Sequence, residues 1–209
     1  MALKRAITVD QMYKKKFNIM EFEGVFKASF GKPQLGGTWI VWGNSSQGKT
    51  NLCMQLAKYL TTFGKVAYNS FEEGVSMSFK NTLQRNNMND VASQFIILDG
   101  EGVADLKKRL KKRRSPNIII IDSQQHAKIS KDGYAAMKQE FPNKLFIYVS
   151  HARGKLPKGE VADFIRYDAD LKIRVEGFRA FVDGRLNEAE GVFYDIYPEK
   201  SHFFWQELD

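Results

Sequence analysis

The stretch of sequence that decides the fold is Gly43-Asn44-Ser45-Ser46-Gln47-Gly48-Lys49-Thr50. Its pattern, G-x-x-x-x-G-K-T, builds a loop whose backbone N–H groups turn inward around phosphates. An apolar run over residues 38–42 precedes the loop and an amphipathic stretch over residues 51–63 follows it, so we expect a strand, the loop and then a helix. This context favours a phosphate loop over the alternative, a glycine-rich turn that happens to carry a lysine. The sequence therefore predicts a nucleoside triphosphate site.

The residues of this loop have expected roles toward ATP and Mg²⁺. Lys49 would reach the terminal phosphates, and the Thr50 hydroxyl would complete the shell of the metal ion. The start of the following helix contributes partial positive charge, and Asn51 completes the predicted set of nucleotide-binding residues.

The composition is that of a globular protein of one domain. A chain of 209 residues is long enough for one compact α/β domain and too short for two full ones. Its longest apolar runs are too short to span a membrane and its N-terminus does not resemble a signal peptide, so we expect a cytoplasmic protein. The single cysteine cannot form an internal disulfide, and no Cys/His cluster suggests zinc. The net charge of +8 indicates either a nucleic-acid partner or only the positive charge that nucleotide binding requires.

Hydrophobic patterning divides the chain into a lead-in segment and one domain. Residues 1–35 show no clear period, and we expect an N-terminal arm that packs on the core or on a neighbouring subunit. Residues 36–209 alternate apolar strands with helices, which predicts an α/β fold with a mostly parallel central sheet and helices on both faces. After Leu171, short runs separated by polar turns predict antiparallel C-terminal strands.

The predicted elements follow from these patterns. The expected helices span residues 51–63, 75–86, 103–114 and 134–140. The expected parallel strands span residues 38–42, 66–70, 95–98, 117–122 and 145–150, and the expected antiparallel strands span residues 171–176, 179–182, 192–197 and 202–205.

Acidic residues follow two of the predicted strands. The run Ile118-Ile119-Ile120-Ile121-Asp122 predicts a buried strand that delivers a carboxylate to the sheet edge where α/β proteins bind ligands. There Asp122 can hold Mg²⁺ through water and steady Thr50. Glu72 and Glu73 follow the strand over residues 66–70, and either carboxylate could activate the water that attacks the γ-phosphate, with Glu72 the first choice. The alternative is a pair of acids that favour a helix N-terminus.

These motifs together resemble the RecA-type ATPases, most closely the RadA/Sms and KaiC branch, with the motor domain of replicative helicases more distant. The resemblance covers roughly residues 36–197. It rests on the phosphate loop, Tyr68-Asn69-Ser70-Phe71-Glu72-Glu73, Ile118–Ser123 and Tyr148-Val149-Ser150-His151. It implies ATP hydrolysis in a homo-oligomeric ring or filament, such as a hexamer, with the nucleotide between subunits. It also implies that His151, or the neighbouring Ser150, senses the γ-phosphate, whereas His126 and His202 have no such context and are expected to be structural.

The resemblance implies two further sites. Residues 152–159 match the loop that contacts single-stranded DNA in RecA-like rings, and Arg153, Lys155 and Lys158 are its candidate DNA ligands. The alternative is a mobile surface loop, since it contains no aromatic residue for base stacking. Arg185 matches the arginine that reaches the γ-phosphate of a neighbouring subunit, but Asp183 stands where the RadA/Sms pattern has a lysine. The possible substitutes are Lys172, Arg174 and Arg179.

The predicted function is an ATPase acting on DNA in recombination, repair or replication. The first alternative is a nucleotide-dependent switch of KaiC type that binds a protein partner. A small-molecule kinase and a nucleotide-binding structural subunit are the others. The basic helix over residues 103–114 could bind nucleic acid or an acidic partner, but a solvated face is the favoured interpretation.

Overall fold

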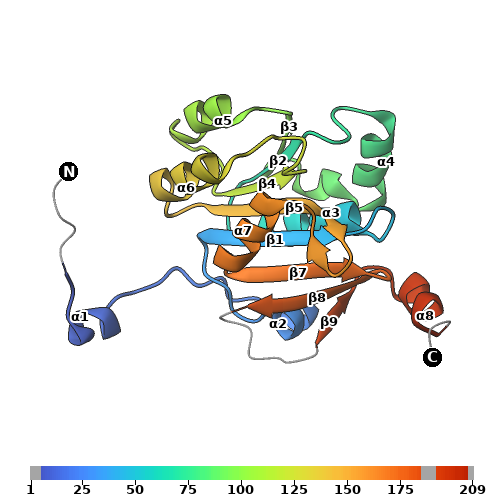
Figure 1. The fold of residues 1–209 in the computed structure, drawn as a ribbon, viewed down its shortest axis with the longest axis horizontal. Coiled ribbons are helices and arrows are strands. Elements are labelled where there is room, and N and C mark those ends of the chain that lie inside the picture. The colour runs from blue at the N-terminus through green and yellow to red at the C-terminus, as the bar shows by residue number, and fades with distance from the viewer. Residues whose placement is uncertain (1–5, 185–191, 207–209) are drawn as a thin grey trace.

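A mixed β-sheet forms the centre of the molecule (Figure 1). The structure is a computed structural model that describes residues 6–184 and 192–206. Within them the sheet has nine strands in the order β3-β2-β4-β5-β1-β7-β8-β9, and β6 pairs with β5. The strands are β1 (Gly37–Gly43), β2 (Val66–Ser70), β3 (Phe95–Asp99), β4 (Ile118–Asp122), β5 (Leu145–Arg153), β6 (Leu156–Pro157), β7 (Leu171–Glu176), β8 (Arg179–Gly184) and β9 (Phe193–Asp195).

The strand directions bring several strand ends to one edge. The pairs β3-β2, β2-β4, β4-β5, β5-β1 and β1-β7 are parallel, whereas β8 runs antiparallel to β7 and β9. In an open sheet of this kind, ligands bind at the carboxyl ends of the parallel strands. The mostly parallel sheet with antiparallel C-terminal strands, predicted from the sequence, is confirmed.

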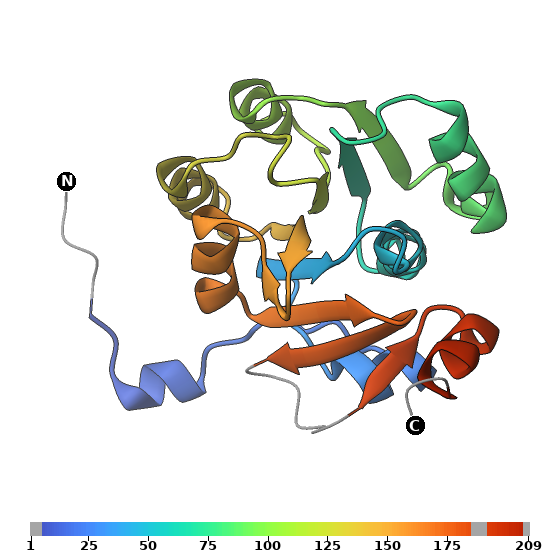
Figure 2. The ribbon, with the colours of Figure 1, turned by 45° about the vertical axis from the view of Figure 1, so that its right-hand side comes forward.

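Helices cover both faces of the sheet, with α5, α6 and α7 on one side and α3 on the other (Figure 2). The helices are α1 (Val9–Tyr13), α2 (Gly24–Phe30), α3 (Lys49–Leu60), α4 (Met77–Arg85), the 3₁₀ helix η1 (Met88–Val91), α5 (Val103–Leu110), α6 (Lys131–Glu140), α7 (Glu160–Asp168) and α8 (Pro198–Gln206). None of the helices in the described residues is both long enough and apolar enough to cross a bilayer.

Strand β4 shows why the apolar runs form the centre. Ile118 and Ile120 pack into the core on the α3 side, and Ile119 and Ile121 pack into the core under α5–α7. Successive side chains of a strand point to opposite faces, so a strand that is covered on both faces must be apolar throughout.

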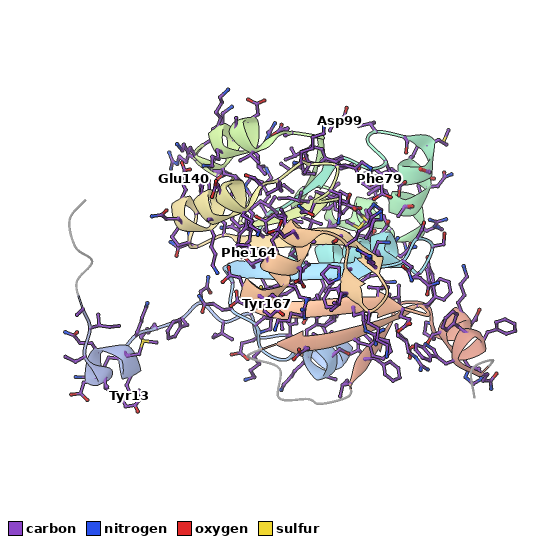
Figure 3. The ribbon with its side chains drawn as sticks, in the orientation of Figure 1. Tyr13, Phe79, Asp99, Glu140, Phe164 and Tyr167 are labelled. Atoms are coloured by element: carbon purple, nitrogen blue, oxygen red, sulfur yellow. The ribbon has the colours of Figure 1, made fainter. Side chains whose placement is uncertain are left out.

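The N-terminal segment contains a core-packed part and an exposed helix. Phe22 and Phe30 are almost fully buried, and Phe26 stacks on Tyr59 with ring centroids 4.1 Å apart. Helix α1, in contrast, has no buried residue and extends away from the sheet, with Tyr13 on its surface (Figure 3). The aromatic residues of α2 therefore belong to the hydrophobic core.

Three elements differ from the sequence prediction. Residues 202–205, predicted as a strand, lie in α8, because Pro198 at the first helical position favours a helix and four residues are too few to reveal a period. Helix α5 ends at Leu110 rather than at residue 114, since no apolar residue follows Leu110 before Pro116. Helix α7 was not assigned from the sequence, although Ala162 and Ile165 are buried at helical spacing.

The segment predicted as a basic loop is partly a hairpin. Strand β5 continues through Arg153, three residues beyond its predicted end, and pairs with β6 around a turn at Gly154, whose φ is +62°. The indole Nε1 of Trp42 donates a hydrogen bond of 3.0 Å to the backbone oxygen of Lys155. The β5–β6 hairpin is therefore anchored to strand β1.

Candidate nucleotide site

The phosphate loop joins β1 to α3, and its glycines are required by the backbone. A Cβ atom on Gly43 would lie 2.3 Å from the carbonyl oxygen of Val175 on β7, so no side chain fits between these strands. Gly48 has a φ of +101° and Ser46 a φ of +62°, both in the left-handed region. The loop thus turns sharply and leaves its backbone open at the N-terminus of α3, where anions bind favourably.

Lys49 lies at the first position of α3 and bends over the loop. Its Nζ donates a hydrogen bond of 2.8 Å to the backbone oxygen of Asn44. Burial lowers the pKa of Lys49, while the carboxylates of Glu72 and Asp122 raise it. The ammonium group is therefore held among the phosphate loop and these two acids, which is the position that a nucleotide's terminal phosphates require.

Asp122 ends β4 and is nearly buried, with 7% of its surface exposed. Burial raises the pKa of Asp122 to about 6, and the hydrogen bond that the Tyr68 hydroxyl donates to Oδ2 lowers it in opposition. The backbone oxygen of Asp122 accepts hydrogen bonds from the N–H groups of Phe71 (2.5 Å) and Glu72 (3.2 Å). This carboxyl group is thus fixed at the sheet edge and suited to a cation that would favour its charged form.

The two acids that follow β2 point to different partners. Oε2 of Glu72 lies 3.5 Å from Nε2 of His151, and its side chain is 40% exposed. Oε2 of Glu73 instead accepts a hydrogen bond of 2.7 Å from the Ser78 hydroxyl near the start of α4. Glu72 is therefore the acid that faces the end of β5, beside the phosphate loop.

His151 lies on β5 directly opposite Gly43 on β1 in the sheet register. Burial lowers the pKa of His151, and Glu72 raises it while Lys49 lowers it. The imidazole is thus next to the first residue of the phosphate loop and to the proposed general base. This placement fits a group that responds to the γ-phosphate.

The sequence analysis did not place His126 in this site. Its Nδ1 lies 2.7 Å from the Ser123 hydroxyl, and its ring centroid lies 5.8 Å from that of His151. The available signal was that the turn after β4 adjoins the end of β5, which depends on strand order and not on a local motif. Ligand atoms of Glu72, His126 and His151 all lie within 4.8 Å of one another.

Comparison with known proteins gives the fold a name. No protein-family model and no curated protein matches the chain. A solved helicase ATPase domain is similar, with a TM-score of 0.62 and 16% identity over 92% of this chain and 93% of that one. The flagellar accessory protein FlaH from Methanocaldococcus jannaschii has a TM-score of 0.59 and 20% identity over 86% and 92%. The chain has the RecA-like fold of P-loop ATPases.

A third structure supports the same assignment. The KaiC-like protein PH0186 from Pyrococcus horikoshii OT3 has a TM-score of 0.58 and 15% identity over 86% of this chain and 91% of that one. The RecA-like fold predicted from the motifs is thereby confirmed. At 20% identity or less, similarity establishes the fold, and the activity has to be argued from the site.

In this RecA-like fold the basic hairpin is linked to the nucleotide site. Nε2 of Gln125 donates hydrogen bonds to the Ser150 hydroxyl (2.7 Å) and to the backbone oxygen of Lys158 (2.8 Å). The backbone N–H of Lys158 donates to the backbone oxygen of His151 (2.8 Å). The side chains of Arg153, Lys155 and Lys158 are exposed. A short chain of hydrogen bonds thus connects the predicted phosphate sensor with the predicted DNA ligands.

The candidate arginine finger lies outside the described residues, and two of its substitutes are engaged within the chain. Arg185 is in the segment 185–191. Arg174 pairs with Glu176 and lies over the ring of Phe181. Arg179 pairs with Asp195 at 3.2 Å and also donates to the Ser201 hydroxyl. Lys172 is half-buried on β7 opposite Asp183 of β8.

The basic helix α5 uses much of its charge in ion pairs within the chain. Lys107 and Lys111 both pair with Glu140 of α6, at 3.0 and 2.7 Å (Figure 3 labels Glu140). Lys108 pairs with Asp105, and Arg109 with Glu101. These contacts favour the interpretation of α5 as a solvated face, and they leave the β5–β6 hairpin as the better candidate for a polyanion site.

Proposed function

We propose that this chain is a Mg²⁺-dependent ATPase that acts on DNA and assembles as a ring or filament, with the nucleotide bound between subunits. The observation that carries the proposal is the convergence of Lys49, Asp122 and Glu72 at the carboxyl ends of adjacent parallel strands. These residues supply the phosphate ligand, the metal ligand and the base that hydrolysis of a phosphoanhydride needs.

The chemistry assigned to these residues is transfer of the γ-phosphoryl group to water, which releases ADP and phosphate. Glu72 orients the attacking water and accepts its proton as the new P–O bond forms. Lys49 contacts the β- and γ-phosphate oxygens and stabilises the charge that develops on the leaving oxygen. Thr50 and Asp122 hold Mg²⁺, which when bound neutralises charge on the phosphates. The close-packed glycines of the loop leave backbone space for the phosphates, so the residues present fit this ligand.

The openness of the site supports assembly as a homo-oligomer. Residues 44–46 of the phosphate loop are exposed, and so is the side chain of Glu72. A neighbouring subunit that covered this edge would exclude water and could place a guanidinium group at the γ-phosphate. We assign that role to Arg185, with Lys172 as the substitute that keeps the same sheet edge.

The exposed basic hairpin supports DNA as the ligand. Arg153, Lys155 and Lys158 carry three positive charges on one short element, and the chain as a whole carries +8. Such a surface follows a phosphate backbone without reading base sequence. Because Gln125 connects this hairpin with Ser150, DNA binding and the nucleotide state can influence each other.

A nucleotide-dependent switch that binds a protein is the second candidate. It is favoured by the absence of any aromatic residue in residues 152–159 and by the ion pairs that occupy the charges of α5. The KaiC-like PH0186 has the same fold.

One experiment separates the two candidates. ATP hydrolysis is measured with and without single-stranded oligonucleotides, at low and at moderate salt, and DNA binding is measured in parallel. The proposal expects stimulation by DNA that weakens as salt rises. Turnover that ignores DNA, with no binding at either salt, would support the protein-binding switch. ATP binding without turnover would instead indicate a nucleotide-binding structural subunit.

A further inference from the structure

Three neighbouring strands each place one metal-ligating side chain at the same point. Glu72 follows β2, His126 lies in the turn after β4, and His151 lies on β5. Since β4 pairs with both β2 and β5, the ends of these strands are adjacent. Two of the three histidines of the chain therefore meet one carboxylate, and the third, His202, lies apart on α8.

The spacing of these side chains is close to that of a bound ion. Nε2 of His151 and Oε2 of Glu72 are 3.5 Å apart. Two ligands of a tetrahedral ion with bonds of about 2.1 Å are separated by about 3.4 Å. The ligand atoms of all three residues lie within 4.8 Å of one another, so the third ligand has to approach by about an ångström. Glu72 and His126 are exposed and can rotate to do so.

Surrounding contacts orient both imidazole groups. The Ser123 hydroxyl lies 2.7 Å from Nδ1 of His126, so Nε2 is the nitrogen left for another ligand. The backbone oxygen of His151 accepts hydrogen bonds from the Ser150 hydroxyl (2.9 Å) and from the N–H of Lys158 (2.8 Å), which fixes the strand that carries this side chain.

We propose that Glu72, His126 and His151 form a binding site for Zn²⁺ or a similar transition-metal dication, distinct from the Mg²⁺ site of Thr50 and Asp122. Two imidazole nitrogens and one carboxylate oxygen are ligands of Zn²⁺, whereas Mg²⁺ prefers oxygen ligands alone. Three protein ligands leave a fourth position for water or for an oxygen of the nucleotide. Lys49 and Lys158 lie close by and oppose a second cation, so the site binds less tightly than a four-ligand structural zinc site.

The proposed function gives this site a consequence. The ion would take the Glu72 carboxylate that is assigned to activate the attacking water. Occupancy by Zn²⁺ therefore inhibits ATP hydrolysis, and the zinc site acts as a brake on the ATPase. This part of the inference rests on the proposed function, whereas the binding of the ion does not.

The first test measures binding without any nucleotide. The full chain, purified without a histidine tag, competes for Zn²⁺ with a chromophoric chelator, and Co²⁺ reports the coordination through its visible absorption. We expect one Zn²⁺ per chain and a loss of affinity of at least about tenfold in His126→Gln and in His151→Gln. The matched control, His202→Gln, should bind as the wild type does. Equal affinity in wild type and His126→Gln would overturn the site.

The second test measures Zn²⁺ inhibition of Mg²⁺·ATP hydrolysis. Inhibition of the wild type should follow zinc occupancy, and in His126→Gln it should require at least about tenfold more Zn²⁺. Zinc that binds without inhibiting the wild type would contradict the brake. A wild type with no ATP turnover at all would refute the proposed function, and the nucleotide-free binding result would still decide whether the site exists.

Discussion

The Tyr68 hydroxyl donates a hydrogen bond to Oδ2 of Asp122 inside the sheet edge, where both side chains are almost completely buried. One oxygen of the carboxyl group is thereby bonded to the protein, and the other remains for the metal shell. Burial raises the pKa of Asp122 and the hydrogen bond opposes that rise, so the tyrosine helps to keep the metal ligand ionised at neutral pH.

Replacing Tyr68 by Phe should therefore make metal binding more sensitive to acid. Without the donor, the pKa of Asp122 rises above its present value of about 6, and a larger fraction of the carboxyl is protonated near neutral pH. Mg²⁺·ATP affinity at about pH 6.5 should fall several-fold relative to the wild type, and the difference should vanish by about pH 8. Nucleotide titrations across this range measure it. A deficit that is constant with pH would mean that the tyrosine acts only by packing.

Asp122→Asn should abolish Mg²⁺-dependent ATP binding and stabilise the fold at neutral pH. A folded-state pKa of about 6 against an unfolded value near 3.8 gives stability that is fully present below pH 3.8 and lost as pH rises through 6. The amide has no such loss, and its oxygen can still accept from Tyr68. The gain at about pH 7.5 should reach about 3 kcal/mol at most and disappear near about pH 4.

Urea unfolding at those two pH values measures this gain. Asp99→Asn is the control, because Asp99 ends the neighbouring strand β3 with an exposed side chain (Figure 3). It should change the free energy of unfolding by less than about 0.5 kcal/mol at either pH. Equal stability of Asp122→Asn and wild type at the higher pH would contradict the assigned cost of burying the charge.

Glu72→Gln should remove ATP hydrolysis and preserve ATP binding. The amide cannot accept the proton of the attacking water, so turnover should fall by about 10²–10⁴-fold. Glu73→Gln is the matched control, because Glu73 bonds to Ser78 rather than to His151. Single-turnover hydrolysis and nucleotide binding are measured on both variants. If Glu73→Gln is the inactive one, the roles of the two acids are exchanged.

The local motifs of the site could be predicted from the sequence, because short segments determine them. The phosphate loop contains its own glycines and its own lysine, and the strand ending in Asp122 is apolar on both faces. The choice between Glu72 and Glu73 could not be made from the sequence, since it depends on the Ser78 hydroxyl and on the position of His151. The place of His126 was missed because it results from the order β2-β4-β5.

The errors in secondary structure have similar physical causes. Helix α8 places aromatic residues beside the turn at Gly177, where the indole of Trp205 donates a hydrogen bond of 3.1 Å to the backbone oxygen. That tertiary contact is not encoded in the short run over residues 202–205, which fits a strand equally well. Helix α7 is amphipathic, but it follows a glycine and precedes a strand without a capping side chain, so its boundaries carry little local signal.

Replacing Arg153, Lys155 and Lys158 together by Ala should weaken binding of single-stranded DNA. If each side chain contacts one phosphate, the slope of log affinity against log salt should become smaller by about 2. Lys112, Arg113 and Arg114, replaced together, remove the same charge after the end of α5 and should change the slope little. Fluorescence anisotropy over a salt series measures both. A larger loss in the second variant would move the DNA site to α5.

Phe22→Ala should destabilise the protein strongly, and Tyr13→Ala should not. Phe22 is buried against Trp39 and Tyr59, with ring centroids 6.4 and 5.0 Å away, so truncation leaves a cavity that costs about 3–5 kcal/mol. Tyr13 is 84% exposed on α1, and its loss should cost less than about 0.5 kcal/mol. Chemical unfolding compares the two variants. If Tyr13→Ala lowers the oligomer mass in sedimentation while leaving monomer stability unchanged, α1 packs on a neighbouring subunit. If both variants retain wild-type stability, the segment before residue 35 contributes nothing to the core.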